Sequence, residues 1–434
     1  MKHRILIFLL LPLITNAQEV LTPEDMISSV PKNSFGIQIA EQSVQIAEVQ
    51  NNLGNAGLLP TVSVSAAGSY SNNNSELTIL GQPAPIEING AEATQLNAGL
   101  AVNYTLFNGF AGRNTFKKLK IQEDLADVTK RTQVELTIAA SLQAYYQAAG
   151  LQQSVEAANE SLQISADRLE RAKLKYEYGG QSKLEYLSAQ VDYSNDSVAF
   201  LNTRLALNQA KRQLSYLMAK DFESDFKLDD NVEFQEMLSK DELKSKAMED
   251  NAQLRNARMN IMLAEQDVKI SNSGYYPRIS LNAGYNFVSS ENEASVLTQQ
   301  VSNGLNTGVS LSYNLFSGNQ RKTAIKISQI RLQNEMMKED DAELQMIRDL
   351  ENAYDAFETR KTLQKAEESN LTTAKRSFER ANELYSLGAI TNVQFRDAQL
   401  NLFRAKIRAA QSKFDLKLAE VELLRVSGQL LNKE

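Results

Sequence analysis

A short phrase of this 434-residue chain occurs twice, half a chain apart. NYTLFNG at 103–109 returns as SYNLFSG at 312–318, an offset of 209 positions. Longer blocks repeat in the same order: LPTVSVSAAGSY (59–70) with YPRISLNAGYNF (276–287), NAGLAVNYTLFNG (97–109) with NTGVSLSYNLFSG (306–318), and YEYGGQSKLEYLSAQ (176–190) with YSLGAITNVQFRDAQ (385–399). A two-copy repeat of this length indicates a duplicated domain rather than a solenoid. The fold is therefore expected to consist of two halves with one order of elements.

Each half contains two segments in which apolar and polar residues alternate. In the second segment, Leu100, Val102 and Tyr104 alternate with Ala101 and Asn103. A period of two predicts strands, which we place at about 61–71, 96–107, 278–288 and 306–316. Their polar faces consist of Ser, Asn, Thr and Gly, and about ten residues are enough for a tilted strand to cross a bilayer. Two half-buried hairpins of a soluble sheet would explain the same pattern equally well.

Long stretches without proline and nearly without glycine follow each pair of strands. Leu151, Val155, Ala158 and Leu162 are separated by four and three residues, the heptad spacing of a coiled coil. The pattern predicts long helices at about 112–178, 182–219, 319–386 and 391–428, with glycines at the two reversals. A helix of about 67 residues is about 100 Å long, which is more than a single globular core requires.

The N-terminus and the segment between the repeats complete the predicted organisation. Residues 1–17 combine a basic start, an apolar core and a small-residue cleavage site, which indicates a secretory signal peptide. The apolar run is too short for the alternative, a membrane anchor, which needs about 20 residues. The acidic segment 221–240 breaks the heptads and is expected to connect repeat 1 (18–220) with repeat 2 (241–434).

The composition excludes several classes of function. The formal net charge is -7, whereas nucleic-acid binding needs a basic surface. The chain has no Cys, and its one His, His3, lies in the predicted signal peptide, which argues against Ser-His or Cys-His nucleophiles and against ordinary zinc sites. We therefore predict no catalytic residue, no cofactor and no metal, and no enzyme activity, although these counts do not exclude a carboxylate pair.

One chain is not enough if the four strands enter a membrane. Lipid offers no hydrogen-bond partner to an open sheet edge, so spanning strands must form a closed barrel. Four strands cannot close alone, and several copies must then contribute four strands each. Two copies would give eight strands and three would give twelve, and the pattern does not choose between them.

The order and double occurrence of these motifs resemble the TolC-like outer-membrane efflux proteins over essentially the whole chain after the signal peptide. The resemblance rests on the duplication, on the prolines that open the odd strands (Pro60, Pro277), on the LFxG phrases and on the YxxG reversal motifs. It implies a mainly α-helical protein with a β-barrel part. The duplicated α-hairpin/β-hairpin protomer would form a homotrimer with a 12-stranded outer-membrane β-barrel, continued by a long periplasmic α-helical barrel.

The same resemblance implies a passive export channel. Such a channel is the exit duct of a tripartite efflux pump or a type I secretion system. It receives small molecules or proteins from an inner-membrane transporter and a periplasmic adaptor protein. The expected location is the outer membrane of a Gram-negative-type cell, in contact with outer-membrane lipid, with a periplasmic extension and no nucleic-acid partner. The alternative is a non-conducting, adhesin-like coiled-coil protein of the outer membrane.

Two sets of candidate residues accompany these motifs. Aromatic residues near the strand ends are expected at the membrane interface: Tyr70, Phe107, Phe110, Tyr276 and Phe316. The resemblance implies that the two reversal loops contact the adaptor: Gly179, Gly180, Gln181 and Ser182 in the first, and Gly388, Ala389, Ile390 and Thr391 in the second. Ordinary helix capping explains the glycines and hydroxyls of these loops as well.

A third set lies just beyond the loops. The resemblance places the periplasmic gate at Tyr176, Glu185, Tyr385, Gln394 and Asp397. Three copies of Asp397 would surround one axis and favour cations at the entrance. Ile390 stands where some relatives have an Arg two residues after the glycine, so one charge-assisted link of the gate is expected to be missing. A solvated helix face is the alternative for Glu185 and Asp397, since acidic residues suit the first turn of a helix.

Overall fold

The computed structural model describes residues 19–78, 80–81, 83–180, 182–219, 226–293, 295 and 297–431. The predicted signal peptide, 1–17, lies outside these residues. The chain divides into two compact units: unit 1 comprises Met1–Glu41, Thr129–Leu254 and Glu343–Glu434, and unit 2 comprises Gln42–Val128 and Arg255–Ala342. Two long helices, α3 (Ala111–Glu177) and α7 (Gln320–Ser386), contribute residues to both units.

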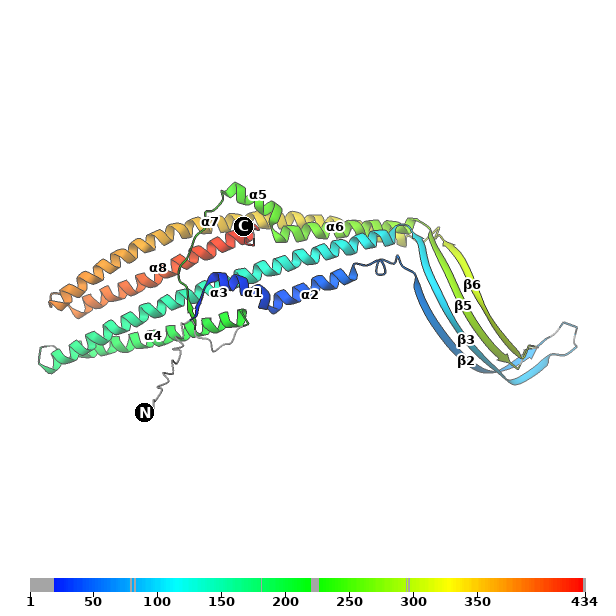
Figure 1. Ribbon diagram of the computed structural model, residues 1–434, viewed down its shortest axis with the longest axis horizontal. Helices are drawn as coiled ribbons and strands as arrows, with labels where there is room; N and C mark the ends of the chain where they lie inside the picture. Colours follow the sequence, from blue (N-terminus) through cyan, green and yellow to red (C-terminus); the bar gives the residue numbers. More distant parts are fainter. Residues whose placement is uncertain are drawn as a thin grey trace, which may run out of the picture. The chain divides into compact units, whose positions relative to one another are not determined.

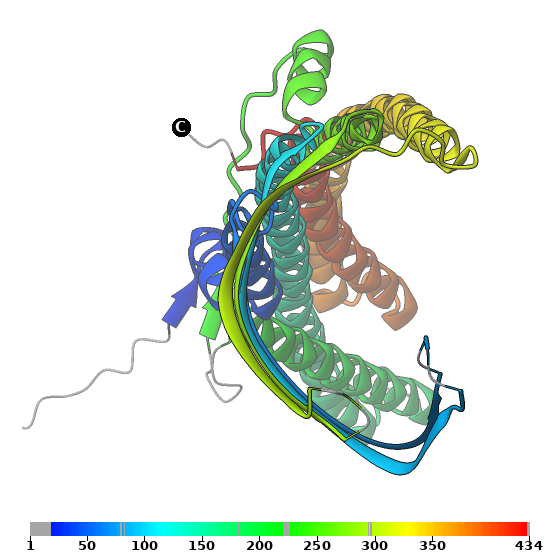
Figure 2. The same ribbon diagram turned by 90° about the vertical axis from the view of Figure 1, so that its right-hand side faces the viewer.

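Unit 2 contains one four-stranded antiparallel sheet (Figure 1). Its strand order is β2-β3-β5-β6, so the hairpins of the two repeats lie side by side and pair through β3 and β5. The strands are β2 (Thr61–Leu77), β3 (Ile86–Asn108), β5 (Arg278–Asn292) and β6 (Gln299–Ser312). Figure 2 shows that they bend together into one curved sheet. β2 and β6 form its edges, and neither has a second partner strand within the described part of the chain.

The strand bounds differ from the prediction at both ends of the sheet. All four strands extend further toward the hairpin loops than predicted, into segments where Asn, Gln and Glu interrupt the apolar alternation. The prediction that the last strand continues to residue 316 is wrong. Ser312 already pairs with Arg278, the first residue of β5, so the residues that follow have no partner strand among the described residues. Segment 313–316 is accordingly irregular.

Both strand-to-helix turns use left-handed backbone at the glycine of the repeated phrase. The angle φ is +65° at Gly109 and +57° at Gly318. A Cβ on Gly109 would overlap the carbonyl oxygen of Ser273 and lie 2.8 Å from Cβ of Tyr276, whereas nothing lies within 4 Å of a Cβ on Gly318. The LFxG phrase therefore ends in glycine for a backbone reason in both repeats, and for a packing reason only in the first.

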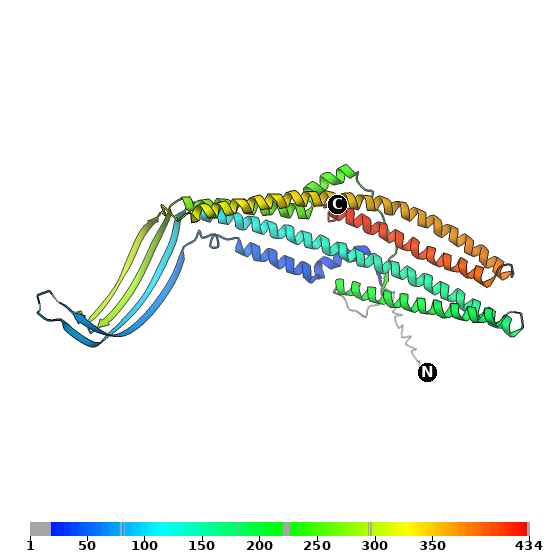
Figure 3. The same ribbon diagram turned by 180° about the vertical axis from the view of Figure 1, so that it is seen from behind.

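Unit 1 contains two long helical hairpins, which lie side by side in Figure 3. The first joins α3 to α4 (Lys183–Leu217), and the second joins α7 to α8 (Asn392–Val426). These four helices begin and end within two residues of the predicted bounds. Tyr146 of α3 stacks on Phe414 of α8 with ring centroids 6.0 Å apart, so apolar packing joins the first hairpin to the second.

Shorter elements that the periodicity did not separate accompany the hairpins. They are β1 (Glu19–Leu21), α1 (Pro23–Asn33), α2 (Phe35–Gln50), β4 (Phe226–Leu228), α5 (Lys240–Asp250) and α6 (Ala252–Asn272). β4 lies in the predicted connector, of which 221–225 are outside the described residues, and it pairs in parallel with β1. The hydroxyl of Tyr145 on α3 holds this pair, since it donates to the carbonyl oxygens of Leu21 (2.8 Å) and Asp229 (2.9 Å).

No helix within the described residues is both long enough and apolar enough to cross a bilayer.

Candidate functional site: the hairpin tips

The first reversal loop is built by helix capping. Gly179 has a φ of +77°, and the backbone N–H of Gly180 donates to a carbonyl of the last turn of α3 at 2.8 Å. Ser182 caps α4, because its hydroxyl accepts a hydrogen bond from the backbone N–H of Glu185. Gln181, the fourth predicted residue of this loop, lies outside the described residues.

The second loop repeats this design with a fuller cap. Gly388 has a φ of +70°, and the N–H of Ala389 donates to the last turn of α7 at 2.8 Å. Thr391 and Gln394 form a capping box: the side-chain oxygen of Gln394 accepts from the N–H of Thr391 at 2.9 Å, and the Thr391 hydroxyl accepts from the N–H of Gln394 at 3.3 Å. Gln394, a predicted gate residue, is therefore engaged in the helix cap. Ile390, which precedes Thr391 in the chain, is half-buried.

Aromatic stacking joins the two helices behind each loop. Tyr176 of α3 stacks on Tyr186 of α4, with ring centroids 5.8 Å apart and planes 6° apart. Tyr385 of α7 stacks on Phe395 of α8, with centroids 4.6 Å apart and planes 24° apart. The two pairs occupy equivalent places in the two repeats, so both predicted gate tyrosines have an aromatic partner in their own hairpin.

Charged groups lie near the second of these tyrosines. Burial raises the pKa of Tyr385, while the positive charges of Arg168 and Arg171 act to lower it and the charge of Glu185 adds to the rise. Glu185, another predicted gate residue, therefore lies close enough to Tyr385 for its charge to act on the tyrosine pKa. Asp397 lies on an exposed face of α8.

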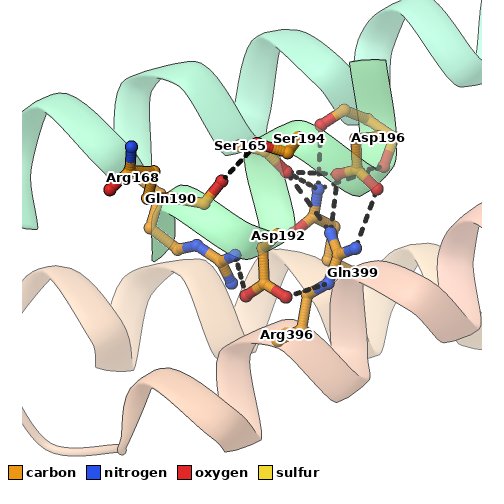
Figure 4. A network of polar contacts seen from close by, with 9 residues as sticks. Ser165, Arg168, Gln190, Asp192, Ser194, Asp196, Arg396 and Gln399 are labelled. Carbon is orange, nitrogen blue, oxygen red and sulfur yellow. Dashed lines mark hydrogen bonds and ion pairs between the residues drawn. The ribbon is translucent and has the colours of Figure 1, made fainter. Parts of the chain in front are cut away.

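A charge network joins the two hairpins about two helical turns beyond the second loop (Figure 4). Arg396 of α8 donates two hydrogen bonds, both 2.7 Å long, to the two carboxylate oxygens of Asp196 on α4. Its Nη1 also donates to the hydroxyl of Ser165 on α3 at 3.3 Å. Asp192 lies 3.7 Å from Nε of Arg396 and pairs on its other side with Arg168 of α3. Positive and negative groups thus alternate along the network.

Neutral side chains complete the same contact. The side-chain amide of Gln399 on α8 donates to the carbonyl of Ser161 at 3.0 Å, to its hydroxyl at 3.1 Å and to the hydroxyl of Ser165 at 3.2 Å. Ser165 is 0% exposed and Gln399 is 2% exposed, so water does not compete for these bonds. The interface between the hairpins is therefore both polar and closed.

The network sets the ionisation of its members. Burial acts to raise the pKa of Asp196, but hydrogen bonds from Arg396, Ser165 and Ser161 outweigh it, and the pKa lies below its usual value. Burial lowers the pKa of Arg168, against the attraction of Asp192. Nε and Nη1 of Arg168 have no hydrogen-bond partner among the described residues. Hydrogen bonds therefore offset the cost of burying the Arg396–Asp196 pair, whereas the cost of burying Arg168 is offset less completely.

The periodicity of the helices did not indicate this network, although the sequence contains one signal for it. The repeat places Leu187 at the position equivalent to Arg396, and Ala405 at the position equivalent to Asp196. Charged residues that replace apolar ones in only one copy of a repeat indicate a contact that the other copy does not make.

The predicted interface aromatics lie in unit 2 and separate into two groups. Phe107, Phe110 and Tyr276 form one cluster, with centroids 5.3 to 6.4 Å apart and edge-to-face geometry. Tyr70 was expected at a strand end, but β2 continues to Leu77, so Tyr70 lies within the strand. Phe316 follows the end of β6 and is 79% exposed.

Comparison with known proteins identifies the class of protein that this fold and these tips define. The outer membrane efflux protein family matches residues 26–220 and 243–429. The chain belongs to that family, so it is an outer-membrane efflux channel with a periplasmic extension. The family is one of channel proteins rather than enzymes.

Individual relatives are distant in sequence and similar in fold. Outer membrane protein TolC of Vibrio cholerae is 21% identical over 384 residues, which are 87% of this chain and 84% of the relative. The CmeC outer membrane channel of Campylobacter jejuni superimposes with a TM-score of 0.78 at 14% identity, over 94% of this chain and 86% of that chain. The structure of CusC gives a TM-score of 0.76 at 17% identity, over 94% of this chain and 92% of that chain. These structures support a β-barrel continued by a helical barrel.

Proposed function

We propose that three copies of this channel protein assemble into one exit duct through the outer membrane. The observation that carries the proposal is the four-stranded sheet with two open edges. Lipid cannot satisfy the unpaired N–H and C=O groups of such edges. Neighbouring strands of the sheet are all antiparallel, so β6 of one copy can pair with β2 of the next without breaking this order. Three copies supply twelve strands, the number that the family resemblance implies.

An apolar stripe on α4 supports contact between copies. Leu184, Val191, Val198 and Leu205 recur every seven residues, and each is more than half exposed in the single chain. A heptad stripe of this kind is typical of a helix that packs against another helix. A helix of a neighbouring copy would cover the stripe, and burial of apolar surface would stabilise the assembly.

The two reversal loops are the proposed contact with a periplasmic adaptor protein. This surface consists of Gly179, Gly180, Gln181 and Ser182 in one hairpin, and of Gly388, Ala389, Ile390 and Thr391 in the other. Tyr178 and Leu387, which precede the glycines, are 87% and 79% exposed, and exposed large apolar groups beside a turn suit a protein interface. An inner-membrane transporter would supply the cargo and the energy, in a tripartite efflux pump or a type I secretion system.

The periplasmic constriction is proposed to involve Tyr176, Glu185, Tyr385, Gln394 and Asp397. Asp397 is the strongest candidate for a lumen-facing charge, because it is exposed on α8 in the single chain. Gln394 accepts through its side-chain oxygen in the capping box, and its exposed amide N–H groups would make the contact with another copy. Tyr385 is half-buried against Phe395 and would shape the constriction through its ring.

Two measurements on the mature protein in detergent test this proposal. Native mass spectrometry should give three chains per particle, and planar bilayers should record discrete conductance steps that favour cations. A trimer without conductance would favour the alternative, a non-conducting structural protein. A monomer that stays monomeric in lipid would contradict the assembly itself.

A further inference from the structure

Unit 1 contains a cavity of about 600 Å³ on which the proposed duct does not depend. Its walls come from α1, from α3, from the segment 229–235 after β4, and from α8 with the residues that follow it. All of these segments belong to one unit of one chain, so the cavity forms without contact between copies. Sites for small molecules have volumes of about 300–1,000 Å³. The cavity is therefore large enough to hold a small organic molecule.

One part of the cavity wall is apolar. Leu142 of α3 and Val421 of α8 are 4% and 6% exposed, and both belong to the hydrophobic core of unit 1. Tyr146 of α3 and Phe234 of the segment after β4 add aromatic rings. Apolar and aromatic side chains of this kind bind the apolar body of a ligand, while a few polar groups fix its orientation.

The charged side chains on the wall are unbalanced. Four carboxylates line the cavity, and Lys417 supplies the only ammonium group among its lining residues. Lys417 is already paired with Glu420, which is 0% exposed. Within the described residues, Glu24, Asp229 and Glu233 take part in no ion pair. The first turn of α1 stabilises the charge of Glu24, but no helix start accounts for Asp229 or Glu233. The wall thus carries negative charge that no group of the described chain neutralises.

A buried hydroxyl at the same wall indicates a ligand as well. Tyr146 is 3% exposed, and its hydroxyl makes no hydrogen bond within the described part of the chain, whereas the hydroxyl of Tyr145 makes two. Burial raises the pKa of the Tyr146 phenol, and the charges of Glu24, Glu420 and Asp229 raise it further. The hydroxyl therefore lies on the cavity side of the ring, near the carboxylates. A buried polar group without a partner is costly, and water or a ligand usually satisfies it.

We propose that this cavity binds a small organic cation, namely a protonated amine carried on an apolar body. The ammonium group would donate to the oxygen of the Tyr146 hydroxyl and to the carboxylates of Glu24 and Asp229. The apolar body would lie against Leu142 and the ring of Phe234. An anion would be repelled by the carboxylates, and a neutral molecule of the same shape would leave their charge without a counterion. The site therefore selects positive charge.

Three indole compounds of similar shape test the charge requirement: tryptamine has an ammonium group, tryptophol a hydroxyl and indole-3-propionate a carboxylate. The chain has no Trp, so the indole can be excited at a wavelength that tyrosine does not absorb. Fluorescence anisotropy then reports binding to the mature protein in nanodiscs of zwitterionic lipid, with protein-free nanodiscs as the baseline. Tryptamine should bind about tenfold more tightly than tryptophol, because hydrogen bonds to charged groups are the stronger ones. No binding of tryptamine, or equal affinity for tryptamine and tryptophol, would overturn the proposal.

Tyr146→Phe separates a role in binding from a role in folding. The change removes only the hydroxyl and keeps the ring that stacks on Phe414. It should weaken tryptamine binding about three- to tenfold. It should not lower the unfolding temperature, because the hydroxyl has no hydrogen bond within the described chain to lose. Tyr145→Phe is the matched control at the adjacent position and should lower the unfolding temperature. An unchanged affinity of Tyr146→Phe for tryptamine would rule out the proposed site.

A second pair of variants tests the charge of the wall. Glu233 lines the cavity, whereas Glu236, three residues further along the same segment, is exposed and does not line it. Glu233→Gln should weaken tryptamine binding severalfold and Glu236→Gln should not, and salt should reduce the difference. Equal effects of the two variants would show that tryptamine responds to the overall negative charge of the chain, which would contradict a site in the cavity. Binding is measured without conductance, so these results do not depend on the proposed duct.

Discussion

The two glycines that end the LFxG phrases should respond differently to the same substitution. Gly109→Ala and Gly318→Ala both place a side chain in left-handed backbone, with φ of +65° and +57°. Only the first introduces a clash, with the carbonyl of Ser273 and with Cβ of Tyr276. The pair therefore separates the backbone requirement from the packing requirement within one protein.

The expected magnitudes follow from these two terms. An alanine in left-handed backbone costs about 1–2 kcal/mol, which applies to both variants. Overpacking costs a further amount of about 1–3 kcal/mol, and it applies only to Gly109→Ala, because the atom in the way belongs to the backbone and cannot rotate aside. Gly109→Ala should therefore destabilise the protein by about 2–5 kcal/mol, and Gly318→Ala by about 1–2 kcal/mol.

Thermal unfolding in detergent at one fixed scan rate is the assay, with tyrosine fluorescence as the signal because the chain has no Trp. Both variants should unfold below the unmodified protein, and Gly109→Ala should unfold at the lower temperature of the two. Equal midpoints would show that the contact with Ser273 and Tyr276 does not constrain this turn. A midpoint for Gly318→Ala below that of Gly109→Ala would contradict the packing contribution at the first turn.

Three further predictions concern unit 1. Tyr145→Phe removes the donor shared by the carbonyls of Leu21 and Asp229 and should cost about 1–3 kcal/mol in a denaturant titration; an unchanged midpoint would contradict a role in holding β1 and β4. Because the pKa of Asp196 is lowered in the folded protein, its ionised carboxylate stabilises the fold at pH values above the usual pKa of 3.8, and this contribution is lost as the pH falls through the folded pKa. Asp196→Asn should therefore flatten the acid side of the profile of stability against pH. A profile parallel to that of the unmodified protein would argue against the ion pair. Asp397→Asn should reduce cation selectivity, seen as a smaller reversal potential in a KCl gradient, and an unchanged potential would exclude Asp397 from the constriction.

The fold was predictable where one local rule decides the outcome. The period of two in Leu100, Val102 and Tyr104 identifies a strand, and glycines at Gly179 and Gly388 mark the ends of long heptad helices. The end of β6 was not predictable in this way. It depends on where β5 begins, at Arg278, and the periodicity of a strand does not specify which residues of its neighbour it pairs with.

The candidate site shows the same division. The capping residues Ser182 and Thr391 could be recognised because they act on backbone only three residues away. Arg396 and Asp196 are 200 residues apart, and each looks like an ordinary solvated charge on its own helix. Only the fold brings them together, and only the comparison of the two repeats indicates that they differ from their equivalents.

The most direct test of the proposed trimeric duct is a cryo-electron microscopy reconstruction of the mature protein in lipid nanodiscs. The proposed duct requires three chains around one axis, with β6 of each chain paired to β2 of the next in a twelve-stranded barrel, and the helical hairpins arranged as a tube that continues it. Two chains with eight strands, or a single chain whose sheet edges stay open, would contradict the trimeric duct.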